Sequence, residues 1–177
     1  GSSWILGGMT HQNYDNANKV FFDLETNGFR GSGSIYNTYH RIIQISGVFE
    51  GKSFCSLVNP QTHIPSQSTA IHGVSDNDVQ AAPTFYDAFG AFLNFIYENT
   101  DSTEPTILIA HNAFGFDIPM LEKECTRFGI AIPPELLVYD SLLAYRKYFP
   151  LKTSKKLGDL YEECFGERMP NAHDALA

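Results

Sequence analysis

The chain has 177 residues, of which 43% are hydrophobic, and a formal net charge of -8. This length fits one domain with a substantial core, and the hydrophobic content excludes a disordered protein. The acidic balance argues against a protein that coats nucleic acid through bulk charge, but it allows an enzyme that holds a few phosphates locally. The three cysteines, Cys55, Cys125 and Cys164, have neither zinc nor disulfide spacing. We therefore expect an intracellular protein, cytoplasmic or located in the nucleoid or nucleus.

The N-terminal segment contains no targeting signal that we can identify. Trp4-Ile5-Leu6 is too short for the core of a signal peptide, and no apolar stretch approaches the roughly 20 residues of a membrane span. Residues 1–8, which precede Met9, are typical of an expression remnant. We expect no membrane association and a single domain over residues 9–177.

The first half of the chain predicts three strands. An apolar run that ends at Leu24 is followed by a Gly/Ser-rich loop over residues 28–33. Residues 41–49 and 52–58 predict two more strands, which flank a tight turn at Glu50-Gly51. The three strands are expected to form an antiparallel meander.

The second half predicts alternating helices and strands. A helix opens at Pro83-Thr84, a buried strand covers residues 106–110, a helix covers about 117–127, and a strand covers 136–139. Further helices are predicted over residues 141–148 and 156–165, and another near His173. Apolar residues at helical spacing in the first helix predict its core face: Phe85, Ala88, Phe89, Phe92, Leu93 and Ile96. This order predicts an α/β fold in which helices cover both sides of a mixed sheet.

Two acidic residues close the first strand. Asp23 and Glu25 are two positions apart, so their carboxylates point to the same side of the strand. Two like charges in close proximity raise each other's pKa unless a cation relieves them, and paired oxygen ligands suit Mg²⁺ or Mn²⁺ better than zinc. The pair predicts a metal site. The alternative is two solvated residues that cap the turn at Asn27 and Gly28.

Two further residues extend this hypothesis. Asp117 follows the fourth predicted strand at a helix start, where it is either an N-cap or, if strands one and four are neighbours, part of the same acidic site. His173 lies among small residues near the C-terminus. Beside a metal-activated water, a histidine is well matched to accept a proton near neutral pH.

The ordered set of motifs resembles the DEDDh 3′-to-5′ exonuclease family, and its proofreading members most of all. The resemblance runs from Val20 onward. It rests on Asp23-Leu24-Glu25-Thr26, Ile42-Ile43-Gln44-Ile45, Ile71-His72-Gly73-Val74, Pro83-Thr84-Phe85, His111-Asn112-Ala113 leading to Asp117, Asp140-Ser141-Leu142-Leu143, and His173 with Ala175-Leu176-Ala177.

The resemblance implies an RNase H-like three-layer α/β/α fold with a five-stranded mixed sheet. It also implies that Asp23, Glu25 and Asp117 hold two divalent ions, Mg²⁺ or Mn²⁺, and that His173 is the general base. The expected substrate is a single-stranded DNA or RNA 3′ end, and the expected product is a nucleoside 5′-monophosphate. Homodimers occur among relatives, and proofreading relatives imply a polymerase as a candidate partner.

Several positions match substrate contacts of the family. Thr26 and Phe29 match contacts to the terminal nucleotide, and His72 matches a substrate-side position. The alternatives are a partly buried loop aromatic for Phe29 and a helix-end residue for His72. Asn112 is a further candidate, with bracing of the turn before Asp117 as its alternative. A basic segment over residues 146–156, in an otherwise acidic chain, makes Lys155 and Lys156 candidate phosphate contacts, with a solvated loop as the alternative.

One departure from the family concerns its fourth acidic ligand, which falls five residues after the histidine and therefore one position beyond Ala177. Asp174 directly follows His173 and is no substitute, because adjacent helical side chains point about 100° apart. The C-terminal helix is thus expected to be truncated. Two alternatives stay open: a catalytically impaired nucleic-acid-binding or assembly module that lacks this ligand, and an exoribonuclease with the same metal site.

Overall fold

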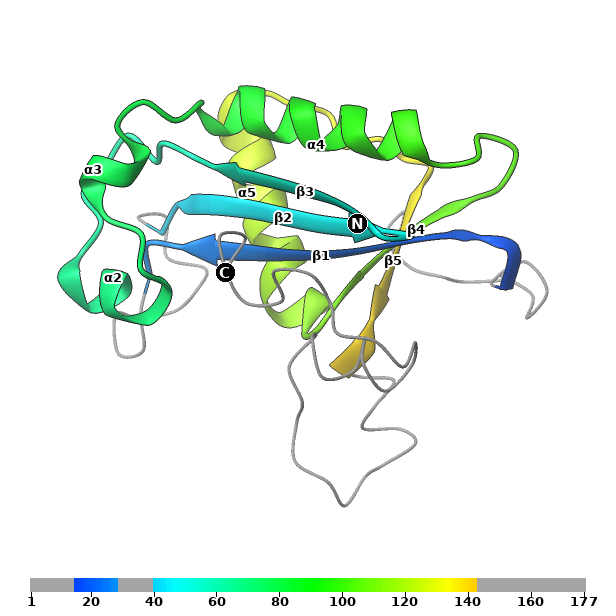
Figure 1. The fold of residues 1–177 in the computed structure, drawn as a ribbon, viewed down its shortest axis with the longest axis horizontal. Helices are drawn as coiled ribbons and strands as arrows, with labels where there is room; N and C mark the ends of the chain where they lie inside the picture. The colour runs from blue at the N-terminus through cyan, green and yellow to red at the C-terminus, as the bar shows by residue number, and fades with distance from the viewer. Residues whose placement is uncertain (1–14, 29–39, 143–177) are drawn as a thin grey trace, which may run out of the picture.

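The computed structural model describes residues 15–28 and 40–142. Its centre is a five-stranded sheet in the order β3-β2-β1-β4-β5 (Figure 1). β1 pairs antiparallel with β2 and parallel with β4, and β5 is parallel to β4. The predicted mixed sheet and the antiparallel meander are therefore confirmed. The strands are β1 (Asn18–Thr26), β2 (Ile42–Phe49), β3 (Lys52–Leu57), β4 (Thr106–Ala110) and β5 (Leu136–Asp140).

The turn between β2 and β3 has the geometry that its sequence predicts. Glu50 and Gly51 both have positive φ angles, of 47° and 79°. Two consecutive positive φ angles define the turn type whose twist matches that of two antiparallel strands. The turn fixes the pairing in which Phe49 lies opposite Lys52.

Two helices, α4 (Phe85–Asn99) and α5 (Ile118–Phe128), pack against one face of the sheet (Figure 1). The predicted core face of α4 is confirmed for five of its residues, and Leu93 is partly buried against the same core. α4 approaches β2 so closely that a Cβ on Gly47 would lie 2.6 Å from the Phe92 ring. Any other residue at position 47 would therefore displace the buried Phe92 ring. The buried residues of α4 are Phe85, Ala88, Phe89, Phe92 and Ile96.

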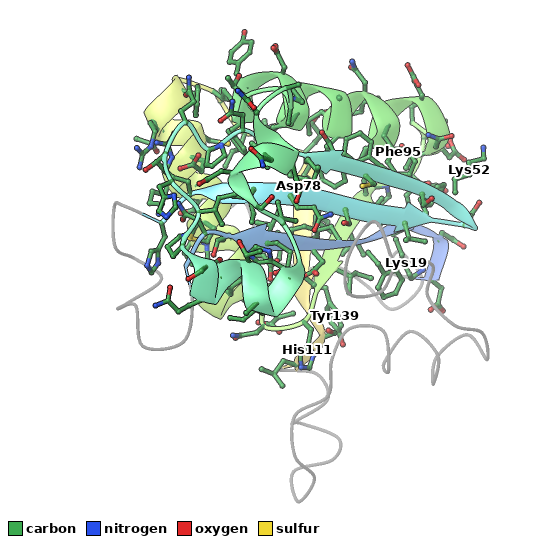
Figure 2. The ribbon with its side chains drawn as sticks, turned by 60° about the vertical axis from the view of Figure 1, so that its left-hand side comes forward. Lys19, Lys52, Asp78, Phe95, His111 and Tyr139 are labelled. Atoms are coloured by element: carbon green, nitrogen blue, oxygen red, sulfur yellow. The ribbon has the colours of Figure 1, made fainter. Side chains whose placement is uncertain are left out.

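Two short helices that the sequence does not predict lie beside the end of β1 (Figure 1). They are α2 (Ser66–His72) and α3 (Asp76–Val79). A small apolar cluster joins this region to the sheet through Ile43, with Val74 and Val79 among its buried members. In Figure 2, Asp78 marks α3 in front of the strands, and Lys19 and Lys52 mark the opposite end of the sheet.

Two hydrogen bonds join the residue after β1 to the residue before β2. The N–H of Asn27 donates to the carbonyl of Arg41 at 3.0 Å, and the N–H of Arg41 donates to Asn27 Oδ1 at 2.7 Å. The Arg41 guanidinium also pairs with the buried Glu124 of α5 at 3.1 Å. These contacts fix the points at which the chain leaves β1 and enters β2.

The helices predicted over residues 141–148 and 156–165 and near His173 lie outside the described residues. The same holds for the candidate site residues Phe29, Lys155, Lys156 and His173. In the part of the chain that the structure describes, no helix combines the length and the apolar character that a membrane crossing requires.

Candidate active site

Three carboxylates are delivered to one edge of the sheet by three parallel strands. β1, β4 and β5 run in the same direction, so their carboxyl ends meet at this edge. Asp23 lies near the end of β1, Asp117 follows β4, and Asp140 ends β5. β1 and β4 are neighbours in the sheet. This confirms the condition under which Asp117 was expected to join the acidic site.

Asp23 and Glu25 lie on the same face of β1. The intervening Leu24 and the preceding Phe22 belong to the core under α4 and α5, whereas Phe21 belongs to the cluster on the opposite face. Alternation along the strand therefore places both carboxylates on the side of Phe21. Across β2, Asp23 pairs with Ser46 and Glu25 pairs with Gln44.

Asp117 is a helical residue and does not act as a side-chain N-cap. Its φ and ψ angles are -64° and -45°, and its carboxylate makes no capping hydrogen bond. A π-helical turn, Ala113–Asp117, precedes α5 and carries Asp117. The side chain is 2% exposed, and its Oδ2 accepts no hydrogen bond from the described residues. A buried carboxylate oxygen without a donor requires a proton or a cation.

The carboxylates of Asp23 and Asp117 are electrostatically linked. Burial raises the pKa of Asp23 to about 7, although a hydrogen bond from the Leu24 backbone opposes the shift. Burial raises the pKa of Asp117 well above its ordinary value, and the negative charge of Asp23 raises it further. The Leu24 backbone also hydrogen-bonds to Asp117. Both carboxylates therefore lie at the same peptide group.

This arrangement fits a hard divalent cation. Two neighbouring carboxylates and an unpartnered carboxylate oxygen offer the oxygen donors that Mg²⁺ and Mn²⁺ prefer, and a cation would remove the electrostatic cost of ionising both. Among the described residues, no three His, Cys, Asp or Glu side chains gather in one metal-holding group. The structure thus brings Asp23 and Asp117 together, and a joint metal site with Glu25 stays a prediction.

Asp140 is a structural anchor of the site. It belongs to one of the motifs that resemble the family, but the sequence alone assigns it no role. Its carboxylate accepts backbone N–H groups from Asn112, Phe114 and Leu142, each at 3.0 Å. The first two donors flank the start of the π-helical turn that carries Asp117. Asp140 is 5% exposed, and its charge also raises the pKa of Asp117.

Asn112 braces the same turn through its backbone. It adopts a left-handed conformation with φ 63° and ψ 41°, and its carbonyl accepts the N–H of Phe116 at 2.9 Å. A Cβ on Gly115 would lie 2.3 Å from Asn112 Oδ1, so any other residue there would displace the Asn112 amide. The geometry supports the bracing alternative for Asn112, and the role in substrate binding stays a prediction.

Thr26 lies in a compact turn just beyond the acidic pair. Its Oγ1 accepts the N–H of Gly28 at 3.2 Å. The ring of His40 packs against Gly28, so that a Cβ there would lie 3.0 Å from His40 Nδ1. His72 comes close to the same turn through Ser68, whose Oγ lies 2.8 Å from its Nε2. The structure therefore places both Thr26 and His72 near the end of β1.

Gln44 is a buried polar side chain near the site. It is 1% exposed, and neither its Oε1 nor its Nε2 has a hydrogen-bond partner among the described residues. It lies opposite Glu25 at the end of the regular β1–β2 register, just before a β-bulge between Glu25 and Thr26. The local sequence offers no signal for the burial of this amide.

The sequence of the chain is similar to those of known proteins. The model of the exonuclease family RNase_T matches residues 20–177. DNA polymerase III subunit epsilon of Buchnera aphidicola subsp. Baizongia pistaciae is 34% identical over 143 residues, which cover 76% of this chain and 55% of the relative. The same subunit of subsp. Schizaphis graminum is 31% identical over 166 residues, which cover 89% of this chain and 66% of the relative.

The fold is shared with solved DEDDh nucleases. The crystallographic structure of the nuclease domain of 3′hExo, a DEDDh family member bound to rAMP, superposes with a TM-score of 0.66 at 15% identity. The match covers 77% of this chain and 72% of that domain. At this identity, the likeness shows the fold alone, and it confirms the predicted RNase H-like α/β class.

The chain belongs to the exonuclease family of hydrolases, as the resemblance to DEDDh 3′-to-5′ exonucleases predicted. It spans a little over half to about two thirds of the length of the two polymerase subunits that it matches.

Proposed function

We propose that this domain is a metal-dependent 3′-to-5′ exonuclease that removes nucleoside 5′-monophosphates from single-stranded DNA or RNA ends. The observation that carries the proposal is the pair of Asp23 and Asp117, which share the Leu24 backbone at the carboxyl edge of β1 and β4. A proofreading role and association with a polymerase are supported by relatives that are named as polymerase subunits. Association with a polymerase would place the protein inside the cell.

In the proposed site, Asp23, Glu25 and Asp117 hold two divalent ions. When bound, these ions would neutralise the scissile phosphate and lower the pKa of the attacking water. Asp140 keeps the turn before Asp117 in place through its backbone hydrogen bonds. His173 accepts the proton of the water as general base.

Substrate binding is assigned to groups around this centre. Thr26, at the turn beyond β1, contacts the terminal nucleotide, and Phe29 packs against its base. Asn112 is a candidate contact from the β4 side. Lys155 and Lys156 contact phosphates further along the strand, so reversing both charges should reduce the salt dependence of binding.

The direct test is a cleavage assay on matched DNA and RNA oligonucleotides that carry a 5′ label. The expected result with Mg²⁺ or Mn²⁺ is a ladder that shortens from the 3′ end, together with release of nucleoside 5′-monophosphates. Asp23→Asn should abolish this activity while its circular dichroism spectrum stays that of the wild type. Unchanged cleavage by Asp23→Asn would overturn the metal assignment.

The same assay addresses the alternative of a binding or assembly module. Such a module would bind single-stranded oligonucleotides in a filter-binding or anisotropy assay and would release no nucleotide with either metal. The ratio of the cleavage rates on DNA and RNA distinguishes a deoxyribonuclease from an exoribonuclease, because the two substrates differ at the 2′-hydroxyl.

A further inference from the structure

Ser68 connects α2 to the turn that follows the acidic strand. It is completely buried, and its Oγ lies 3.1 Å from the carbonyl oxygen of Thr26 and 3.2 Å from that of Gly28. The same Oγ lies 2.8 Å from Nε2 of His72, one helical turn further along α2. One hydroxyl group therefore joins His72 to two carbonyls of the turn.

The partners of this group define where its protons lie. Nδ1 of His72 accepts the backbone N–H of Val74 at 3.1 Å, so a neutral His72 carries its proton on Nε2. Nε2–H then donates to Ser68 Oγ. The Ser68 hydroxyl donates in turn to the carbonyl of Thr26 or Gly28, since carbonyl oxygens only accept. The hydrogen bonds thus run in one direction, from Val74 through His72 and Ser68 to the turn.

The turn that accepts the Ser68 hydrogen bond lies directly beside the proposed metal ligands. Thr26 is the residue after Glu25, and a β-bulge separates the two in the pairing with β2. Its Oγ1 already accepts the N–H of Gly28 at 3.2 Å. The ring of His40 packs against Gly28. The conformation of the turn is therefore set by Ser68 and His40 as well as by its own hydrogen bond.

We propose that Ser68 and His72 are positioning residues for the site of the terminal nucleotide. His72 orients the Ser68 hydroxyl, and Ser68 holds the Thr26–Gly28 turn in the conformation that receives the nucleotide. His72, which is 8% exposed with both ring nitrogens hydrogen-bonded inside the protein, acts through Ser68 rather than on the substrate. This inference rests on the proposed function.

The first test compares Ser68→Ala with Ser66→Ala in the full chain. Ser66 lies in the same helix and is exposed, and its Oγ bonds to the Gln67 side chain at 3.4 Å. Ser68→Ala should raise the KM for a single-stranded oligonucleotide about tenfold, the effect of one lost hydrogen bond, with kcat changed about twofold or less. It should also weaken binding of a nucleoside 5′-monophosphate, measured by calorimetry with Mg²⁺, by a similar factor. Ser66→Ala should match the wild type in both measurements.

The second test uses His72→Phe, alone and with Ser68→Ala. His72→Phe alone should weaken nucleotide binding, and it should have no further effect in the Ser68→Ala protein, because both residues act through one hydroxyl. An undiminished effect of His72→Phe in that background would show direct contact and overturn the inference. Wild-type KM and nucleotide affinity in Ser68→Ala would also overturn it, while cleavage by the wild type would leave the proposed function standing. Absence of cleavage by the wild type would overturn the proposed function. The calorimetric comparison of nucleotide binding by the wild type and Ser68→Ala would still test the inference.

Discussion

The carboxylate of Asp140 accepts the backbone N–H of Phe114 at 3.0 Å, and this bond links the end of β5 to the π-helical turn after β4. Helical turns of the π type are rare and cluster at functional sites. Here the turn ends on Asp117, whose carboxylate must meet that of Asp23. The position of a proposed metal ligand therefore depends on an acidic residue that we do not place among the ligands.

Replacing Asp140 by Asn should destabilise the fold and weaken metal binding together. An amide offers one acceptor oxygen instead of two and turns a donor toward backbone N–H groups, so the expected loss is about 2 to 4 kcal/mol of unfolding free energy. Urea unfolding measures it. Asp101→Asn is the control, because Asp101 also accepts two hydrogen bonds from Thr103 but is exposed. Equal losses in the two variants would contradict the anchoring role of Asp140.

The metal-free protein should lose stability as the pH rises. The pKa of Asp23 is about 7 in the folded state and 3.8 ordinarily, so between these values the folded state holds a proton that the unfolded state has released. The unfolding free energy should therefore fall from about pH 4 to about pH 7. Asp23→Asn should weaken this dependence, since only the raised pKa of the buried Asp117 then contributes, and in EDTA it should be more stable than the wild type at pH 8 by about 1 to 3 kcal/mol. A wild type that gains stability over this range would refute the assignment.

Divalent ions should reverse that loss. Mg²⁺ or Mn²⁺ binds the ionised carboxylates and so stabilises the folded state, by about 2.7 kcal/mol when its concentration is a hundred times the Kd. Because protons compete for the same oxygens, the rise in Tm should be larger at pH 8 than at pH 5. The comparison is made at constant ionic strength with NaCl, and Asp23→Asn should show little rise. A similar rise in that variant would place the metal elsewhere.

Replacing Gln44 by Met should stabilise the protein. Both polar atoms of the buried Gln44 amide lack partners among the described residues, and an unsatisfied buried group costs about 1 to 3 kcal/mol, which an apolar side chain of similar shape recovers. Thermal and urea unfolding measure the gain. Gln80→Met is the exposed control and should change stability by about 0.5 kcal/mol or less. Destabilisation by Gln44→Met would show that the amide has a partner in solution.

His173→Ala should slow nucleotide release by a factor on the order of 10² to 10⁴, the usual range for a general base. Single-turnover rates over a pH series measure this effect. In the wild type, the rate should rise with pH near neutrality as His173 loses its proton. In the variant, this rise should disappear. His11→Ala is the control, since no role is assigned to His11. A rate loss of the same size in both variants would contradict a specific role for His173.

The sequence predicts the parts of the fold that depend on local pattern. The short apolar runs of β1 and β4, bounded by polar or turn residues, indicate buried strands, and the helical spacing of apolar residues in α4 indicates a buried face. The pairing of Asp23 with Asp117 also followed, since it needs only parallel neighbouring strands that end at one edge. These expectations depend on local pattern and on strand order alone.

Other features depend on contacts that no local pattern encodes. The helix α2 has seven residues, too few for a clear period, and Ser68 bonds to a carbonyl 42 positions earlier in the chain. The π-helical turn at Asp117 is stabilised by Asp140 from another strand. The bulge after Glu25 shifts the register of β1 and β2, so that Thr26 lies opposite Ile42. Each of these needs the assembled sheet.

The paired hydrogen bonds between Asn27 and Arg41 hold the end of β1 beside the start of β2. The cost of closing a loop grows only slowly with its length, so changes in length between Gly28 and His40 should leave the register of β1 and β2 intact. Gly28 and His40 themselves belong to the turn beside the acidic pair, since the ring of His40 packs against Gly28. They are therefore the natural splice points for chimaeras that exchange the residues between them.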